Sequence, residues 1–97
     1  MSDLRAELSE TIDEAEWEWL IPHLQRDAVI LVSLNLSLLD VGEAIANDNI
    51  ASVQKWIDQQ FITKPSVEQV GIWNSDRTKR FNTLIIQPYV LMQEIVG

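Results

Sequence analysis

The sequence contains no cysteine, three glycines, three prolines and a single histidine. The lack of cysteine excludes disulfides and thiolate metal sites, and it is compatible with a reducing, cytoplasmic setting. The glycines at Gly42, Gly71 and Gly97 are too far apart to form a glycine-rich loop around a phosphate group. No serine lies in a nucleophile-elbow motif. Because the common enzyme signatures are absent, we expect a non-enzymatic cytoplasmic protein without a cofactor.

The sequence also lacks an uninterrupted run of about eighteen apolar residues, which a membrane-spanning helix needs. Its first residues, MSDLRAELSE, are acidic, whereas a signal peptide begins with a basic region followed by an apolar one. We therefore expect neither a signal peptide nor an association with membranes. A length of 97 residues and a hydrophobic content of 46% are typical of a single domain, residues 1–97, with one modest core.

Positive charge is scarce, with seven Lys and Arg residues against fifteen Asp and Glu residues and a formal net charge of −8. The imbalance is concentrated in residues 1–18, which hold seven acids and one base, so the rest of the chain carries only −2. Such a segment repels nucleic acids and anionic lipids. It favours a basic protein partner, although its commonest meaning is a solvated helix face.

Apolar spacing predicts one amphipathic helix over residues 3–20, capped by Asp3 or Ser2. Its core-facing stripe consists of apolar residues that recur every three or four positions: Leu4, Leu8, Ile12, Ala15 and Trp19. Trp17 lies roughly 120° or more from this stripe, at about 100° per residue. We expect Trp17 either to be covered by the following segment or to contact a partner. Pro22 is expected to end or kink the helix.

Two short helices joined by a polar turn are predicted in the middle of the chain. A capping pattern starts the first helix at Ser37, and the turn residues 47–49 end it and cap the second. The second helix places four apolar side chains on one face, where we expect them to enter the core: Ile50, Val53, Trp56 and Ile57. A further short helix should begin at Ser66, whose capping partner is Gln69.

Several segments have the composition of β-strands. Residues 28–33 form a continuous apolar run and are expected in the centre of a sheet, covered on both faces. Residues 61–64 predict a short edge strand and residues 81–87 a longer strand, each followed by a proline. Residues 89–96 favour neither an edge strand nor a helix clearly. The predicted fold is α+β: a small sheet of about three strands packed by the N-terminal helix and two or three short helices.

The two central helices followed by a strand resemble the helix-turn-helix and winged-helix arrangement of DNA-binding domains. Arg77, Lys79 and Arg80 form a basic loop that could supply the wing. The exposed face of the second helix, however, offers Lys55 and glutamines against Asp58, whereas a recognition helix presents bases and amides to DNA. A nucleic-acid-binding regulator is therefore the alternative function. The preferred interpretation of the basic residues is a solvated loop whose positive charge balances that of the acidic helix.

His23 is the candidate residue for chemistry, because Glu16, Glu18 and Asp27 lie near it in the sequence. Together these groups would have the composition of a divalent-metal site or a general-base site. Glu16 and Glu18 are about 200° apart on an ideal helix, so they do not converge on one ligand. A small hydrolase or metal-dependent enzyme is thus the second alternative, and we assign no catalytic, metal or cofactor residue.

A partner surface is predicted from apolar residues that a small fold does not need for its own core. Trp17 lies off the core stripe, and the C-terminal strip has more apolar surface than an edge strand requires. The strip consists of Tyr89, Val90, Leu91 and Met92. We predict a non-enzymatic protein-interaction or assembly module that forms a homodimer through these residues.

The order of four features is recognisable: the segments VGEAIANDN and VQKWIDQQFITKPS, then Trp73, then the terminal FNTLIIQPYVLMQE. This pattern resembles a family of short proteins from cyanobacteria and proteobacteria that is classed as a domain of unknown function. The resemblance covers nearly the whole chain and implies a bacterial, cytoplasmic, single-domain protein. It implies no functional residues, because the family has none assigned.

Overall fold

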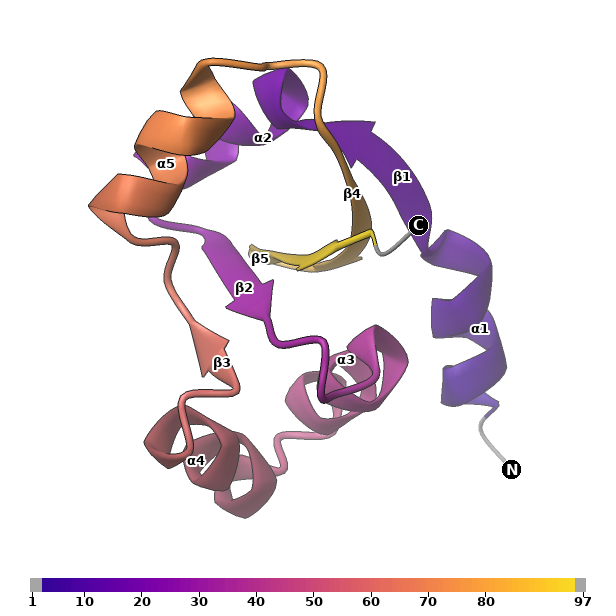
Figure 1. The fold of residues 1–97 in the computed structure, drawn as a ribbon. Helices are drawn as coiled ribbons and strands as arrows, with labels where there is room; N and C mark the ends of the chain where they lie inside the picture. Colours follow the sequence, from indigo (N-terminus) through magenta and orange to yellow (C-terminus); the bar gives the residue numbers. More distant parts are fainter. Residues whose placement is uncertain (1–2, 96–97) are drawn as a thin grey trace.

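The computed structural model describes residues 3–95, which form a five-stranded sheet with helices on both faces (Figure 1). The elements, in chain order, are α1 (Leu4–Thr11), β1 (Asp13–Glu16), α2 (Trp17–Gln25), β2 (Val29–Val32), α3 (Leu38–Ala46), α4 (Ile50–Asp58), β3 (Ile62–Thr63), α5 (Val67–Asn74), β4 (Arg80–Ile86) and β5 (Tyr89–Glu94). The α+β class agrees with the sequence prediction. The sheet is larger than the predicted three strands, because β1 and β5 join it.

The strands lie side by side in the order β1-β4-β5-β2-β3. β4 and β5 form an antiparallel hairpin, in which Ile86 lies opposite Tyr89. β2 runs parallel to β5 and antiparallel to β3. The C-terminal segment is therefore a strand in the middle of the sheet, and the idea that it forms an edge is wrong, because the hairpin brings it alongside β2. Two predicted positions lie outside the described residues: Ser2, a possible helix cap, and Val96, the end of the C-terminal segment.

Local signals in the sequence are confirmed for the middle of the chain. β2 lies within residues 28–33 and has a neighbouring strand on each side, and β3 forms an edge of the sheet. α4 begins after Asn49, whose side chain accepts a hydrogen bond from the Ser52 N–H. α5 begins after Ser66, which forms both hydrogen bonds of a capping box with Gln69. Ser37 precedes α3 as predicted but makes no side-chain capping bond.

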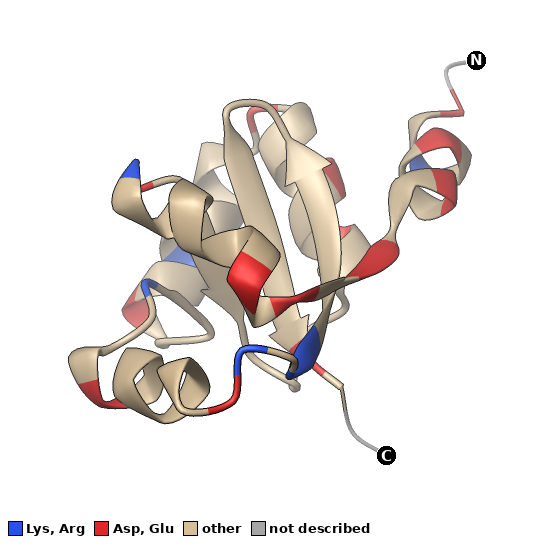
Figure 2. Ribbon diagram, turned by 90° about the horizontal axis from the view of Figure 1, so that it is seen from above, with Lys and Arg blue, Asp and Glu red and all other residues tan. Residues whose placement is uncertain are grey.

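The prediction of one helix over residues 3–20 is wrong. α1 ends at Thr11, the next residues form β1 against β4, and α2 then begins at Trp17 and continues past Pro22. Acidic residues lie along both α1 and β1 (Figure 2). The helical periodicity is overridden because β1 supplies hydrogen-bonding partners to β4, which would otherwise be an unpaired edge.

Trp17 is at the centre of the core on the face covered by α2 and α5. Its ring centroid lies 4.9 Å from that of Trp73 and 6.1 Å from that of Phe81, and its Nε1–H donates to Asn74 Oδ1 at 2.8 Å. Trp17 is fully buried, whereas Trp19 is 43% exposed. The interruption of the helix thus reverses the predicted places of the two tryptophans. Trp17 is covered by distant segments of its own chain and is not available to a partner.

The opposite face of the sheet is covered by α3, against which α1 packs. Val41, Leu84 and Leu91 are fully buried there. α3 approaches β4 closely at Gly42, where an added Cβ would collide with the Leu84 side chain. Arg5 Nη1 of α1 lies 2.7 Å from a carboxylate oxygen of α3, so an exposed ion pair accompanies the apolar contact.

The two tryptophans provide a matched test of the fold. We expect Trp17→Ala to lower the free energy of unfolding by about 3–5 kcal/mol, because it leaves a large cavity between α2, α5 and β4. Trp19→Ala should change it by no more than about 1 kcal/mol, because its ring is partly in solvent. Urea denaturation of both variants measures the difference, and a larger loss for Trp19→Ala would contradict the structure.

Two glycines in helices provide a second test. Gly42→Ala should destabilise the fold by about 1–3 kcal/mol, because the buried Leu84 has little room to move. Gly71→Ala in α5 should stabilise it by up to about 1 kcal/mol, because a Cβ there meets no atom within 4 Å and alanine has the higher helix propensity. Thermal unfolding of the two variants measures both signs, and equal effects would show that α3 does not approach β4 so closely.

Candidate functional site

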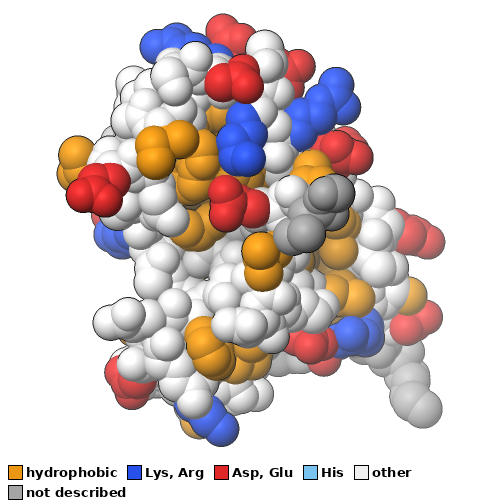
Figure 3. All heavy atoms as spheres, viewed as in Figure 1, with side chains coloured by type: hydrophobic (Ala, Val, Ile, Leu, Met, Phe, Trp, Pro, Cys, Tyr) orange, Lys and Arg blue, Asp and Glu red, His pale blue; other side chains and the backbone are white. Residues whose placement is uncertain are grey.

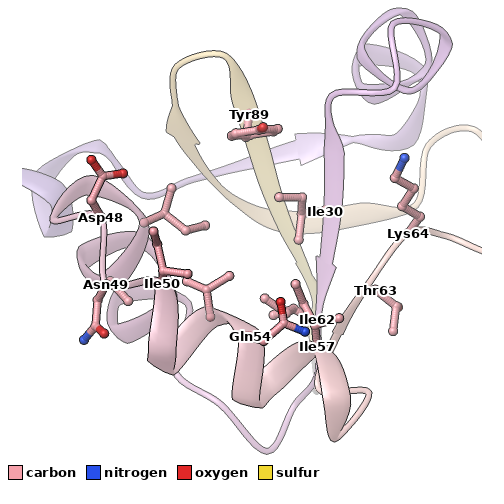
Figure 4. Close-up of a pocket in the computed structure, with 13 residues that line it drawn as sticks. Ile30, Asp48, Asn49, Ile50, Gln54, Ile57, Ile62, Thr63, Lys64 and Tyr89 are labelled. Carbon is pink, nitrogen blue, oxygen red and sulfur yellow. The ribbon is translucent and has the colours of Figure 1, made fainter.

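An apolar groove lies between α4 and the sheet and has a volume of about 460 Å³. Exposed hydrophobic side chains gather over α4, low in the view of Figure 3. The floor of the groove comes from the strands and its wall from α4 (Figure 4), with six principal residues: Ile30, Ile62 and Tyr89, and Ile50, Val53 and Ile57. We call this surface the α4 groove.

α4 contributes no fully buried residue to the core. Ile50 is 75% exposed and Ile57 is 47% exposed, so the prediction that the apolar face of this helix enters the core is wrong for these two residues. It is confirmed in part for Val53 and Trp56, which are partly buried against the core. The turn before α4 explains its position: Asp48 adopts a positive φ of 56°, and the Asn49 N–H donates to Ala44 O at 2.8 Å. This turn holds α4 against α3 and the two-residue strand β3, away from the central strands.

Polar side chains mark the two ends of the α4 groove. Asp48 and Asn49 lie at the N-terminal end of α4, and Lys64 lies at the other end of the groove (Figure 4). Lys64 Nζ lies 2.6 Å from Asp27 Oδ2, and both side chains are largely exposed. The groove therefore combines an apolar centre with charges of opposite sign at its ends.

The predicted C-terminal partner strip is divided by the fold. Val90, Leu91 and Met92 are almost completely buried, because β5 lies between β4 and β2. They cannot contact a partner while the sheet is intact, and this part of the prediction is wrong. Tyr89 is 41% exposed and lines the α4 groove, so it remains a candidate contact residue.

The basic loop leads into β4, whose first residue is Arg80, and is fixed against the start of α2. The Trp17 N–H donates to Lys79 O at 2.8 Å, and the Glu18 N–H donates to Arg77 O at 3.1 Å. Lys79 Nζ lies 3.9 Å from a carboxylate oxygen of β5, and Arg80 is paired with an acidic residue of β1 in the strand register. The loop lies at the opposite end of the molecule from α4 (Figure 1). The fold therefore does not join the loop and the helix-turn-helix-like unit into one surface.

His23 lies near the end of α2 and is partly buried. Its ring centroid lies 4.6 Å from that of Trp19, and its Nδ1 lies 2.8 Å from Arg26 Nη2. Burial lowers the pKa of His23, and the positive charge of Arg26 lowers it further. Within residues 3–95, no three His, Asp or Glu side chains are grouped closely enough to hold a metal ion.

A second groove, of about 720 Å³, lies along β1 and the adjoining part of β4. We call it the β1 groove. Its apolar residues include Trp19 and Ile85, which are 43% and 44% exposed. Four carboxylates line it together with Arg80: those of Asp13, Glu14, Glu16 and Glu18. The sequence prediction missed this site because a continuous helix would have distributed the carboxylates around its axis.

The chain belongs to the family described as protein of unknown function (DUF2288), whose sequence model matches residues 3–94. This confirms the resemblance to a domain of unknown function. A protein with a similar fold is PA1075 from Pseudomonas aeruginosa, whose structure was determined in solution by NMR. The two chains are 26% identical, with a TM-score of 0.82, and the match covers 100% of this chain and 89% of that one. No curated protein matches the chain.

The family and the structural relative assign no chemical activity to these grooves. In the part of the chain that the structure describes, each helix is too short or too polar to cross a membrane. The two grooves are therefore interpreted from their own geometry and charge.

Because the chain has a single histidine, the titration of His23 directly tests the environment described at the end of α2. We expect NMR titration to give His23 a pKa below its ordinary value of 6.5. The neutral ring is favoured in the folded chain, so this group adds stability above about pH 6.5 and the stability is lost as the pH falls through the folded pKa. Arg26→Gln should raise the pKa only part of the way, because burial is the larger cause. A wild-type pKa at or above 6.5 would contradict the described environment.

Proposed function

We propose that this protein is a non-enzymatic interaction module that forms a homodimer through the α4 groove. One observation supports this above others: α4 has four apolar residues on one face, none of them is fully buried, and the helix borders an apolar groove. Monomeric proteins rarely leave a large contiguous apolar surface in water. The exposed Ile50 and Ile57 are therefore better explained if another surface covers them.

A second copy of the chain fits this surface for a geometric reason. The projecting face of α4 and the groove beside it lie on the same side of the molecule (Figure 4). A two-fold axis brings the same surface of each copy together, so a ridge next to a groove can be complementary to itself. Each copy would then place Ile50 and Ile57 toward the groove of the other, with the two α4 helices antiparallel.

The charges at the ends of the groove agree with the same arrangement. Asp48 and Lys64 lie at opposite ends. In an antiparallel two-fold pairing, each end meets the opposite end of the other copy, so Asp48 of one copy would face Lys64 of the second copy. Lys64 is already 2.6 Å from Asp27, so Asp48 of the other copy would share its ammonium group, and this contact would help to set the register but contribute little affinity.

The remaining expectations belong to the same proposal. The absence of cysteine supports a cytoplasmic setting, and the similarity to a Pseudomonas aeruginosa protein supports a bacterial origin. The helix-turn-helix-like unit is poorly suited to bind DNA, because α4 presents isoleucines where a recognition helix would present basic and amide side chains.

Light scattering over a series of protein concentrations tests the dimer. We expect the wild-type chain to reach a dimer, and Ile50→Glu with Ile57→Glu to weaken it at least about thirtyfold, the effect of losing roughly 2 kcal/mol at an interface centre. The matched control is Val67→Glu with Ile72→Glu on α5, which adds the same charge at exposed apolar positions outside the groove. This control should dimerise like the wild type.

Two outcomes would contradict the proposed interface. A wild-type chain that stays monomeric at high concentration would remove the homodimer. Equal weakening by the α4 and α5 variants would show that added charge, and not the α4 groove, controls association. Circular dichroism of both variants establishes that each remains folded.

A further inference from the structure

The β1 groove lies on a different part of the molecule from the proposed dimer surface. Residues that lie opposite each other in a strand pair share a face of the sheet, so Asp13, Thr83 and the more distant Ile85 face the side covered by α2 and α5. The α4 groove is on the other face, to which Ile30 and Tyr89 belong. Glu14 and Glu16 also point to that face, but β1 and β3 are at opposite edges of the sheet, so the two grooves are separate. The Ile85 side chain is 44% exposed although its main chain is paired with β5. This part of the sheet face is therefore only partly covered by the described chain.

β1 also presents a main-chain edge. It is the last strand on its side of the sheet, with β4 as its neighbour. The Trp17 N–H donates to Lys79 O, and hydrogen bonding alternates along an antiparallel pair, so the main-chain groups of Glu14 and Glu16 point away from β4. The Glu14 N–H already donates to Asp13 Oδ1 at 2.9 Å, so a segment along this edge would bond to the other outward-facing main-chain groups or replace that side chain. An extended segment of another chain could lie along this edge.

The charge around the groove determines what kind of segment fits. Four carboxylates and one guanidinium line it, and none of the four carboxylates takes part in an ion pair within the described residues. Glu14 and Glu16 are two positions apart on β1, so their side chains share a face at a spacing of about 7 Å. Alternate residues of an extended peptide have the same spacing. The carboxylates therefore match basic residues at every second position.

We propose that the β1 groove binds an extended basic segment of a partner protein, in which Lys or Arg alternates with apolar residues. The basic side chains lie against Glu14 and Glu16. The intervening apolar side chains then point to the opposite face of the sheet, toward Trp19 and Ile85. This surface is separate from the dimer interface, so the two proposals can fail independently.

The test uses a fluorescein-labelled peptide of alternating lysine and valine, with fluorescence anisotropy as the measurement. The wild-type chain should bind it at low salt and release it as the ionic strength rises. A peptide of alternating glutamate and valine should not bind. Spermine, which has positive charge but no peptide main chain, should compete weakly. Lack of binding by the basic peptide, or equal competition by spermine, would overturn the proposal.

A matched pair of charge variants locates the site. Glu14→Gln with Glu16→Gln should weaken binding by about tenfold, a size expected for two partly exposed ion pairs. Glu7→Gln with Glu10→Gln changes the net charge equally on α1, outside the groove, and should stay within about twofold of the wild type. Equal weakening by both pairs would show that only the overall acidity attracts the peptide, which overturns a site at β1.

Two further measurements separate contact from folding and from dimer formation. Trp19→Ala should weaken peptide binding at least threefold while circular dichroism stays unchanged, and amide chemical shifts should move mainly at residues 13–19 and 80–85. The variant Ile50→Glu with Ile57→Glu should bind the peptide like the wild type. If that variant loses peptide binding, or the shifts cluster around α4, the proposed location is wrong.

Discussion

Four residue pairs join β1 to β4, and the position of Trp17 depends on them. The ladder continues through the hydrogen bond from the Trp17 N–H to Lys79 O, after which the chain turns into α2. This places the Trp17 ring between Trp73 and Phe81 and its Nε1–H on Asn74. One short strand of acidic residues thus decides where α2 begins and how α5 packs. It also leaves Trp19 at the surface.

The parts of the fold that the sequence could predict depend on local chemistry. Capping residues mark the starts of α4 and α5, and a continuous apolar run marks β2. β1 could not be predicted in this way, because Asp and Glu have low β-propensity and its partner lies about 70 residues away, as in the pair Asp13 and Thr83. The central place of β5 likewise depends on pairing between distant segments.

The two grooves could not be predicted from the sequence for a related reason. An apolar helix face such as that of Ile50, Val53 and Ile57 shows that something must cover it, but it does not show whether the same chain supplies the cover. Here the turn at Asp48 directs α4 onto α3, and β3 is only two residues long. A nine-residue helix beside so short a strand is the signal that could have indicated an open groove.

The parallel pairing of β2 with β5 has a consequence for synthesis of the protein. The ribosome makes β2 long before it makes β5, the strand that lies between β2 and β4. A nascent chain that has passed α5 already contains both tryptophans of the core, yet β2 still lacks its central neighbour. The two halves of the sheet can be joined only after the β4–β5 hairpin has emerged, so native folding must wait for the last strand.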